Sequence, residues 1–419
     1  MDHFTYKNSA LFAEEVAITE IAKAVGTPFY CYSTATLVRH FRVFKEAFAD
    51  LNPLICYAVK ANSTLGILKT LANEGSGADV VSAGEIHASL AAGIMPEKIV
   101  FSGVGKTHDE MVYALSKDIF QFNVESESEL LLLSDAAHTL NKIASIALRV
   151  NPDIAPDTHA KISTGQKESK FGVPIKDAIA LYAKAAKLPG IKVQGVSVHI
   201  GSQLTNLAPF ASAFTRIVKL VKELRKNGHE ITTLDLGGGL GIPYGNQEAP
   251  PLPVAYAEIV KSATKGINCQ LIFEPGRLLV GNAGILVTKV IYVKHSDERI
   301  FVIVDAGMND LVRPALYDAY HDIIPVHVNP DAPTELVDIV GPVCETGDIF
   351  ATGRLLKLPK EGDLLAFRTA GAYGASMAST YNARPLIAEI MVNGSNYATL
   401  RHRQTYDELI HRDKLPDWL

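Results

Sequence analysis

A lysine closes one of the most apolar runs of the chain. Residues 54–59 are almost continuously apolar, which is typical of a strand buried on both faces, and Lys60 follows them directly. Burying an ammonium without a partner is costly, and desolvation lowers the pKa of a lysine, as an amine that forms a Schiff base requires. The plainer alternative is a lysine whose stem lies along the strand end while its charge reaches solvent. Other reactive residue types further along the chain favour the chemical role.

Three consecutive glycines, Gly237, Gly238 and Gly239, predict a turn that can bind an anion. They follow the apolar residues 234–236, and without Cβ atoms their backbone N–H groups can converge on one ligand. A tight turn without any ligand is the alternative.

The next apolar run ends in Glu274, Gly276 and Arg277, which supply a carboxylate, another glycine amide and a cation. In enzymes built on a closed barrel of eight strands, the loops after the seventh and eighth strands commonly hold a phosphate. The two turns described here would be those loops, so together they favour phosphate binding. Glu274 could instead pair with Arg277 in a structural salt bridge.

A histidine ends another apolar run, residues 196–198, and Ser202 follows it closely. A single histidine in such a place is more often a core residue with its hydrogen bonds satisfied. At a strand end, however, the flat imidazole of His199 could stack on a planar ring, and Ser202 is small enough to bind the same phosphate.

A lysine, a phosphate turn and a carboxylate point to pyridoxal phosphate. This cofactor needs a Schiff-base lysine, an anion site and an acidic partner for its pyridine nitrogen. A sugar-phosphate enzyme or an aldolase would also use a lysine and a phosphate site, but it has no evident need for Glu274 beside a ring nitrogen.

A cysteine with acidic neighbours forms a further candidate group. Cys344 and Glu345 lie within residues 341–348, where glycines and two acids surround the thiol. Cysteine is usually a small buried hydrophobic residue, but near a cationic cofactor adduct its thiol could donate a proton.

Two other segments offer groups that could bind a substrate. Tyr373 lies in a loop of small residues, and Arg313 and Tyr317 add a cation and a phenol. Arg277 and Arg313 together suggest a carboxylate on the substrate, because arginine binds carboxylates in a bidentate manner.

A repeated order of elements predicts how these residues are positioned. An apolar strand, a small or polar residue at its end and an amphipathic helix recur eight times, which is the pattern of a (β/α)₈ barrel with its functional residues at the carboxyl ends of the strands. A doubly wound open sheet has a similar sequence pattern and is the alternative. The predicted strand ends are Lys60, Ser82, Ser102, Glu125, Asn151, His199, Gly237 and Glu274.

After Glu274 the pattern changes to strands without long helices between them, at residues 284–293, 299–305, 334–340 and 363–367. This predicts a mainly β second domain. We expect a cofactor-binding barrel over residues 36–280 and a β-rich domain formed by residues 1–35 and 281–419. Residues 28–32 read as a strand, and Ser33 as the cap of the helix that follows it.

The bulk properties are those of a globular enzyme of 419 residues with a net charge of -5, and they argue against nucleic-acid binding. The four cysteines lack metal-ligand spacing, so we expect no metal site, and their small number suggests a reducing compartment. We find no secretory signal and no apolar run of membrane-spanning length, so we expect a cytoplasmic protein.

The combined motifs resemble the fold-type III decarboxylases that use pyridoxal phosphate, and within them the diaminopimelate decarboxylases. Glu345 stands where related decarboxylases of basic amino acids usually place aspartate, and residues 158–172 resemble a loop of this subfamily. The arginine pair also suits a substrate with a distal carboxylate, which ornithine lacks. The motifs are residues 57–62, 199–203, 237–239, 274–277, 341–345 and 371–374.

The resemblance implies an alanine racemase-like fold and a role for each candidate residue. Lys60 would bind the cofactor as a Schiff base, His199 would pack on its ring and Glu274 would pair with the pyridine nitrogen. Cys344 would protonate Cα after carbon dioxide leaves. The phosphate would be held by Ser202, Gly237, Gly238, Gly239, Gly276, Arg277 and Tyr373, with Asp79 also in the cofactor site; Arg277, Arg313, Tyr317, Glu345 and Tyr373 would contact the substrate.

The expected reaction is decarboxylation of meso-2,6-diaminopimelate to L-lysine, in a homodimer in which Cys344 and Glu345 reach the active site of the other subunit. Decarboxylation of ornithine or arginine on the same fold is the main alternative. A racemase is disfavoured because the cysteine motif would have no role there. A non-catalytic homologue that only carries pyridoxal phosphate is disfavoured because both the cysteine motif and the second domain are present.

Overall fold

The computed structural model describes residues 2–154, 170–245 and 249–419. Most of the loop at residues 158–172 that resembles the subfamily therefore lies outside the described residues. The chain divides into two units, each considered by itself. The barrel unit comprises Val38–Pro243 and Glu248–Leu279, and the β-rich unit comprises Met1–Leu37, Tyr244–Gln247 and Val280–Leu419.

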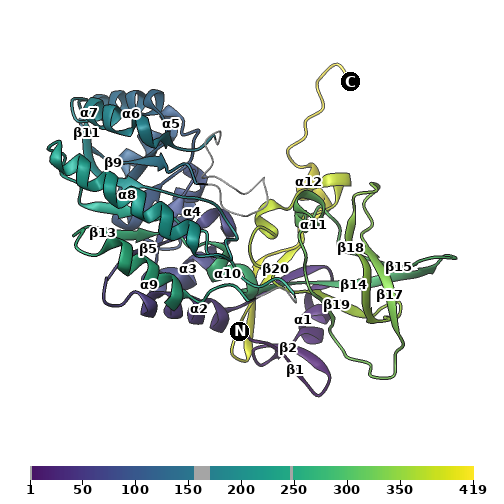
Figure 1. The fold of residues 1–419 in the computed structure, drawn as a ribbon. Coiled ribbons are helices and arrows are strands. Elements are labelled where there is room, and N and C mark those ends of the chain that lie inside the picture. The colour runs from purple at the N-terminus through teal and green to yellow at the C-terminus, as the bar shows by residue number, and fades with distance from the viewer. Residues whose placement is uncertain (1, 155–169, 246–248) are drawn as a thin grey trace. The chain divides into compact units, whose positions relative to one another are not determined.

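Eight parallel strands close the barrel unit into a cylinder (Figure 1). Neighbouring strands pair in parallel around the ring, and β13 pairs with β5 while β8 pairs with β9, so no barrel edge is left open. This closure confirms the predicted barrel and excludes the open sheet. The strands are β5 (Leu54–Ala58), β6 (Gly77–Val80), β7 (Ile99–Phe101), β8 (Gln121–Val124), β9 (Ala144–Asn151), β11 (Ile191–Ser197), β12 (Thr233–Asp235) and β13 (Gln270–Phe273), with β10 (Val173–Pro174) added beside β9.

Helices follow the barrel strands, as the repeated pattern predicts. One of the predicted strand ends, Ser82, is a helix cap, and so are Thr107 and Ser126: the side chain of each accepts a hydrogen bond from a backbone N–H of the following helix. The helices are α2 (Thr34–Ala47), α3 (Leu65–Asn73), α4 (Ala83–Ala91), α5 (His108–Ser116), α6 (Glu127–Thr139), α7 (Ile175–Ala185), α8 (Ala208–Lys226), α9 (Pro253–Thr264) and α10 (Arg277–Val280).

The predicted cap of α2 is also confirmed. Thr36 N donates to the hydroxyl oxygen of Ser33 at 3.1 Å.

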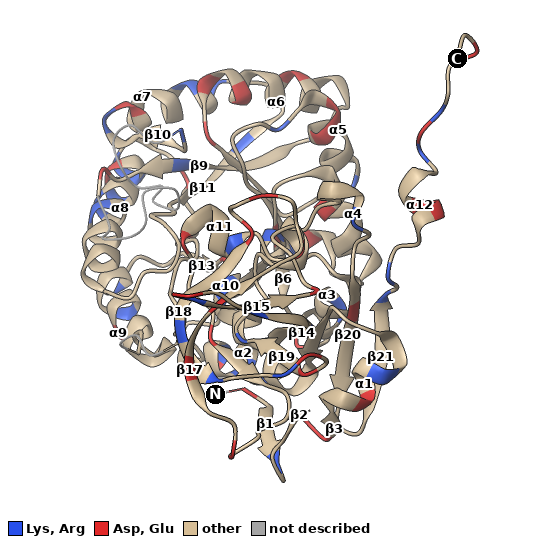
Figure 2. Cartoon of the chain, turned by 90° about the vertical axis from the view of Figure 1, so that its right-hand side faces the viewer, with Lys and Arg blue, Asp and Glu red and all other residues tan. Residues whose placement is uncertain are grey.

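Charges of opposite sign occupy different outer helices: acidic side chains mark α5 and α6, whereas basic ones mark α8 (Figure 2). Among the described residues, every helix is too short or too polar to cross a bilayer.

The β-rich unit is built on a mixed sheet, and the four segments predicted as strands are present in it as β14, β15, β17 and β19. The main path has the order β18-β17-β15-β14-β4-β20-β21, and β19 pairs with β14 and β16. The strands are β4 (Phe29–Ser33), β14 (Gly284–His295), β15 (Ile300–Val304), β16 (Ile323–Pro325), β17 (Thr334–Val340), β18 (Ile349–Lys357), β19 (Leu364–Phe367), β20 (Ala388–Asn393) and β21 (Asn396–Arg401).

A small antiparallel sheet and three short helices complete this unit. Apolar side chains of β4, β14 and β20 form its core together with residues of the small sheet, among them Phe29, Ile285 and Ile390. The additional elements are β1 (Phe4–Lys7), β2 (Ala10–Ala13), β3 (Val16–Ala17), α1 (Ile18–Val25), α11 (Arg313–Tyr317) and α12 (Tyr406–Ile410).

Candidate active site

Lys60 lies on a single 3₁₀ turn, Val59–Ala61, directly after β5. Its Nζ is 3.0 Å from Oδ2 of Asp79, a residue of the neighbouring strand β6. The Lys60 side chain is 38% exposed, whereas that of Asp79 is fully buried. The ammonium is thus held by a buried carboxylate at the strand end, which disfavours the alternative of a lysine that only reaches for solvent.

The second oxygen of Asp79 is an unusual feature of this pair. Within the described part of the chain, Oδ1 is buried and has no hydrogen-bond partner. Buried polar atoms are nearly always satisfied, so an orphaned oxygen next to a lysine marks a place where a further polar group fits.

Glu85 faces the same pair from the first turn of α4. One of its oxygens accepts a hydrogen bond from Val81 N at 2.8 Å. The pKa of Glu85 is raised to about 7, mainly by burial; the hydrogen bond from Val81 lowers it, the charge of Asp79 raises it and the charge of Lys60 lowers it. This residue was missed in the sequence, where an acid in a first helical turn reads only as a favourable helix start.

Glu274, directly after β13, is held inside the barrel by polar side chains of other strands. Its Oε1 accepts hydrogen bonds from Ser102 Oγ and Asn123 Nδ2, both at 3.2 Å. Asn123 Nδ2 also donates to Oδ2 of Asp235 at 2.7 Å, and Oδ1 of Asp235 accepts from Gly237 N at 2.9 Å. Asn123 therefore bridges two buried carboxyl groups.

These two carboxyl groups cannot both be ionised at low cost. Burial is the main cause that raises the pKa of Asp235 to about 6 and the pKa of Glu274 well above its usual value. Hydrogen bonds from Asn123 and Gly237 favour the charged form of Asp235, whereas the charge of Asp235 disfavours the charged form of Glu274. Glu274 is thus the member of the pair that retains a proton.

His199 follows β11 and is oriented by the glycine turn. Gly238 N donates to its Nδ1 at 3.2 Å, so Nδ1 is an acceptor and the proton of the neutral ring is assigned to Nε2. Desolvation, followed by the charges of Arg149 and Lys60, lowers the pKa of His199 well below its usual value. The residue presents a neutral, flat ring.

The glycine turn has no room for side chains. A Cβ at Gly238 would lie 2.2 Å from the carbonyl oxygen of Glu274, and Gly237 and Gly239 have positive φ values of 65° and 111°. The turn is therefore packed directly against the end of the next strand.

The turn after β13 joins the lysine to this region. Ala58 N donates to Pro275 O at 3.2 Å, and a Cβ at Gly276 would lie 3.1 Å from the Cβ of Ala58. Arg277, which is buried, donates through Nη2 to Oγ of Ser202 at 3.1 Å. The predicted phosphate-binding residues are thus neighbours at one end of the barrel.

In the β-rich unit, Arg313 begins α11 and Tyr317 ends it. Arg313 is buried, and its Nη1 lies 2.8 Å from Nε2 of His321. Its guanidinium carbon is 4.7 Å from the ring centroid of Tyr244, a favourable cation–π distance.

Cys344 and Glu345 lie in an exposed loop between β17 and β18. Cys344 N donates to Oδ1 of Asn382 at 2.9 Å. A hydrogen bond with the Glu345 carboxylate, then the charges of Glu345 and Cys344, raise the pKa of Tyr381. Tyr373 has a φ of 56°, a strained conformation for a side-chain-bearing residue that often marks functional sites.

The structure brings together one set of predicted residues at the carboxyl ends of the barrel strands. This set is Lys60, Asp79, His199, Ser202, Gly237, Gly238, Gly239, Glu274, Gly276 and Arg277. The other five, Arg313, Tyr317, Cys344, Glu345 and Tyr373, belong to the β-rich unit. The role of each residue in binding or catalysis stays a prediction.

Some of the partners could have been found in the sequence. Asp235 is a charged residue between two leucines, and Asn123 lies in a short strand one residue before an apolar position, so both carry a signal of buried polar function. Ser102 was identified only as a strand end. No local pattern marks His321 or Tyr244, because their role depends on contacts between distant segments.

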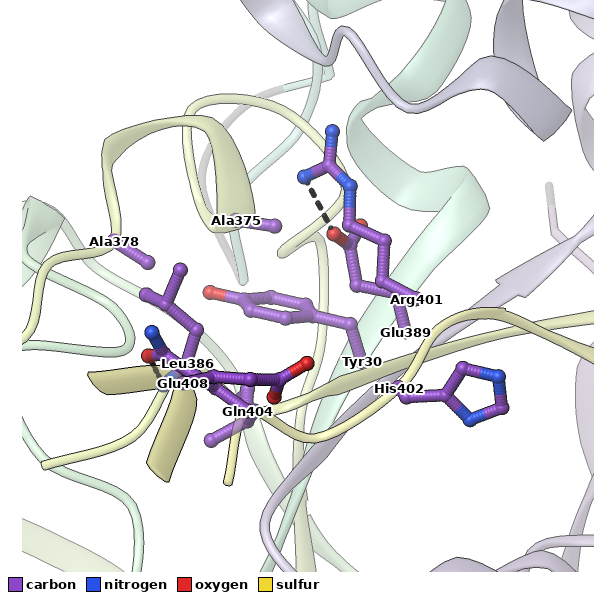
Figure 3. A pocket seen from close by; sticks show the side chains of 10 residues that line it. Tyr30, Ala375, Ala378, Leu386, Glu389, Arg401, His402, Gln404 and Glu408 are labelled. Carbon is purple, nitrogen blue, oxygen red and sulfur yellow. Dashed lines mark hydrogen bonds and ion pairs between the residues drawn. The ribbon is translucent and has the colours of Figure 1, made fainter. Parts of the chain in front are cut away.

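A cavity of about 450 Å³ lies elsewhere in the β-rich unit (Figure 3). Its buried acid, Glu389, already accepts hydrogen bonds from Tyr32 and Arg401 at 2.7 and 2.8 Å. Thr405 caps α12, and the carboxylate of Glu408 accepts a hydrogen bond from Thr405 N at 2.8 Å. None of the predicted site residues lines this cavity, so it is not part of the candidate active site.

Comparison with known proteins agrees with this geometry. The family described as "Pyridoxal-dependent decarboxylase, pyridoxal binding domain" matches residues 34–281. A diaminopimelate decarboxylase from Zymomonas mobilis is 53% identical and one from Pseudomonas aeruginosa is 50% identical, each over 99% of both chains.

Solved structures show the same relationship. The diaminopimelate decarboxylase of M. jannaschii in complex with L-lysine is 38% identical, with a TM-score of 0.95 over 100% of this chain and 99% of that one. The enzyme of Helicobacter pylori complexed with L-lysine is 42% identical, with a TM-score of 0.91 over 94% and 98% of the two chains. The chain therefore belongs to the diaminopimelate decarboxylase family of pyridoxal-dependent decarboxylases.

Proposed function

We propose that this protein converts meso-2,6-diaminopimelate to L-lysine and carbon dioxide with pyridoxal phosphate as its cofactor. The observation that carries the proposal is similarity over the full length: relatives that are 50% and 53% identical over 99% of this chain are named diaminopimelate decarboxylase.

The strand-end residues of the barrel fit this cofactor. Ser202 and Arg277, which are joined by a hydrogen bond of 3.1 Å, supply a hydroxyl and a cation that can bind a phosphate, and the buried Oδ1 of Asp79 needs a polar partner. When bound, pyridoxal phosphate supplies the electron sink that accepts the electron pair left by departing carbon dioxide.

The chain's own groups would hold and orient the reactants. Lys60 would bind the cofactor covalently, and Asp79, 3.0 Å from its Nζ, is placed to take the proton that the amine must lose to become a nucleophile. Glu274, which retains a proton in its buried pair with Asp235, would share that proton with the pyridine nitrogen, and the neutral ring of His199 would pack on the cofactor ring.

The remaining roles concern the substrate. Arg277, Arg313 and Tyr317 would bind the carboxylate that is retained, so that remote binding energy orients the bond that breaks. Glu345 would bind the distal amine, and the thiol of Cys344 would give its proton to Cα. Tyr373 would contact both the phosphate and the substrate.

The test of the reaction is incubation of the purified protein with pyridoxal phosphate and, in separate reactions, meso-diaminopimelate, ornithine and arginine. We expect stoichiometric L-lysine and carbon dioxide from diaminopimelate alone. Release of putrescine or agmatine without any lysine would reject the proposal in favour of a decarboxylase of another basic amino acid.

We also propose a homodimer in which Cys344 and Glu345 serve the partner's active site, because both residues lie in an exposed loop of the β-rich unit. Mixing inactive Lys60→Ala and Cys344→Ala proteins tests this: shared sites in a freely exchanging dimer would restore up to about a quarter of the activity, since half the dimers are mixed and each has one intact site. If subunit exchange is verified and no activity is recovered, the result would contradict shared sites.

The domain limits at residues 36–280 and the cytoplasmic location stay predictions.

A further inference from the structure

The predicted substrate-binding arginine of the β-rich unit is hydrogen-bonded to a buried histidine. Nη1 of Arg313 and Nε2 of His321 are 2.8 Å apart. Because a guanidinium can only donate, Nε2 must accept, which assigns a neutral imidazole with its proton on Nδ1. Nδ1 lies 2.9 Å from the backbone oxygen of Arg368, an acceptor that matches this assignment.

His321 is itself held firmly. Its side chain is buried, with the whole residue only 1% exposed, and its ring meets that of Tyr244 edge to face, with centroids 5.6 Å apart. Its backbone oxygen accepts a hydrogen bond from Nη1 of Arg354 at 3.0 Å, and the Arg354 guanidinium packs over Tyr320 at 4.0 Å from the ring centroid. Both ends of the histidine are therefore fixed by neighbours from different segments.

The choice of partner matters for the charge of Arg313. A carboxylate in the place of His321 would orient the guanidinium, but its negative charge would cancel the positive charge of Arg313. The carboxylate of the substrate needs that positive charge for binding. A neutral imidazole and the face of Tyr244 orient the guanidinium and leave its charge in place. The arrangement suits recognition of an anion by a preorganised cation.

We propose that His321 is a positioning residue that fixes the guanidinium of Arg313 and thereby sets the affinity of the enzyme for the distal carboxylate of its substrate. The inference rests on the proposed function, in which Arg313 binds that carboxylate. His321 itself does not touch the reacting atoms.

Two substitutions separate the two hydrogen bonds of the ring. In His321→Gln the side-chain oxygen can reach the position of Nε2 and keep the acceptor for Arg313. In His321→Asn the shorter amide can reach only the position of Nδ1 and keeps the donor to Arg368 O. A merely structural role through Arg368 would be rescued by asparagine, whereas a positioning role toward Arg313 would be rescued by glutamine.

We expect His321→Asn to raise the KM for meso-diaminopimelate by about 10- to 100-fold, which is the usual effect of losing a hydrogen bond to a charged group. The Kd of the holoenzyme for L-lysine, measured by calorimetry, should rise by the same factor. His321→Gln should stay within about threefold of the wild type in both quantities. The absorbance of the bound cofactor and the borohydride labelling of Lys60 should be unchanged in both variants.

Phe350→Leu is the control for a general loss of packing, because Phe350 is buried in β18 against Phe367, with ring centroids 4.6 Å apart, and the change leaves both His321 and Arg313 in place. It should lower the unfolding temperature without changing KM.

Wild-type KM and Kd values for His321→Asn, or equal losses of affinity in the asparagine and glutamine variants, would overturn the inference. If the asparagine variant does not fold, the glutamine variant decides: a wild-type KM supports the inference and a raised KM overturns it. Absence of lysine formation by the wild-type enzyme would instead reject the proposed function.

Discussion

Glu85, a partly buried acid in the first turn of α4, leads to a prediction about stability and pH. Replacing Glu85 with glutamine keeps the size of the side chain and an oxygen that can accept the hydrogen bond from Val81 N, but removes the ionisable group. Burial raises the pKa of Glu85 from 4.5 to about 7. In the folded protein, therefore, this carboxyl group keeps its proton over a range of pH in which the unfolded chain has lost it.

The size and sign of the effect follow from this difference. Below about pH 4.5 the group is protonated in both states, so its contribution does not vary with pH. As the pH rises toward 7, only the unfolded chain ionises freely, and the free energy of unfolding falls. A shift of about 2.5 pKa units corresponds to about 3 kcal/mol, of which about 2 kcal/mol is lost between pH 5.5 and pH 8. Some residual solvent contact makes these values upper limits.

Urea unfolding of the cofactor-free protein at pH 5.5 and pH 8 measures this effect. Glu85→Gln should exceed the wild type in free energy of unfolding by up to about 2 kcal/mol more at pH 8 than at pH 5.5. Glu97→Gln, which changes an exposed carboxylate of the same unit, should show no such difference. An offset for Glu85→Gln that is the same at both pH values would refute the reasoning, because it would show that the folded protein does not hold this proton.

Three further predictions concern the cofactor and the chemistry. Lys60→Ala should lose borohydride labelling and all turnover; labelling of a peptide that does not contain residue 60 in the wild type would show that another amine binds the cofactor. Gly238→Ala should cost about 1–3 kcal/mol of unfolding free energy and weaken cofactor binding in a spectrophotometric titration, because its Cβ would lie 2.2 Å from a backbone oxygen. Gly105→Ala, where no atom of the described residues beyond the two chain neighbours lies within 4 Å of the added Cβ, should change neither quantity; equal effects of the two would contradict the steric argument. Cys344→Ala should keep the yellow cofactor but lower kcat by about 100-fold or more, and an unchanged kcat would show that another group gives the proton.

The barrel could be predicted because its signals are local. A nearly continuous apolar strand, a polar residue at its end and a following helix are each contained in a short segment, and eight repeats in order specify the topology. The eight predicted strand ends lie at or within two residues of the ends of eight barrel strands. In the β-rich unit, β20 and β21 were not predicted, because an antiparallel pair in which hydrophobic and polar residues are mixed has a weak local pattern.

The sequence by itself determined which residue types stand at the strand ends, and hence that a lysine, a glycine turn and a glutamate meet at one end of the barrel. Only the tertiary structure decided their partners: Asp79 beside Lys60, Asn123 between Glu274 and Asp235, and His321 behind Arg313. Strand ends follow from local hydrophobic patterns, whereas hydrogen-bond partners depend on the register of strands and loops far apart in the chain. The charge states of the buried groups follow from those partners, and so they too became visible only in the folded chain.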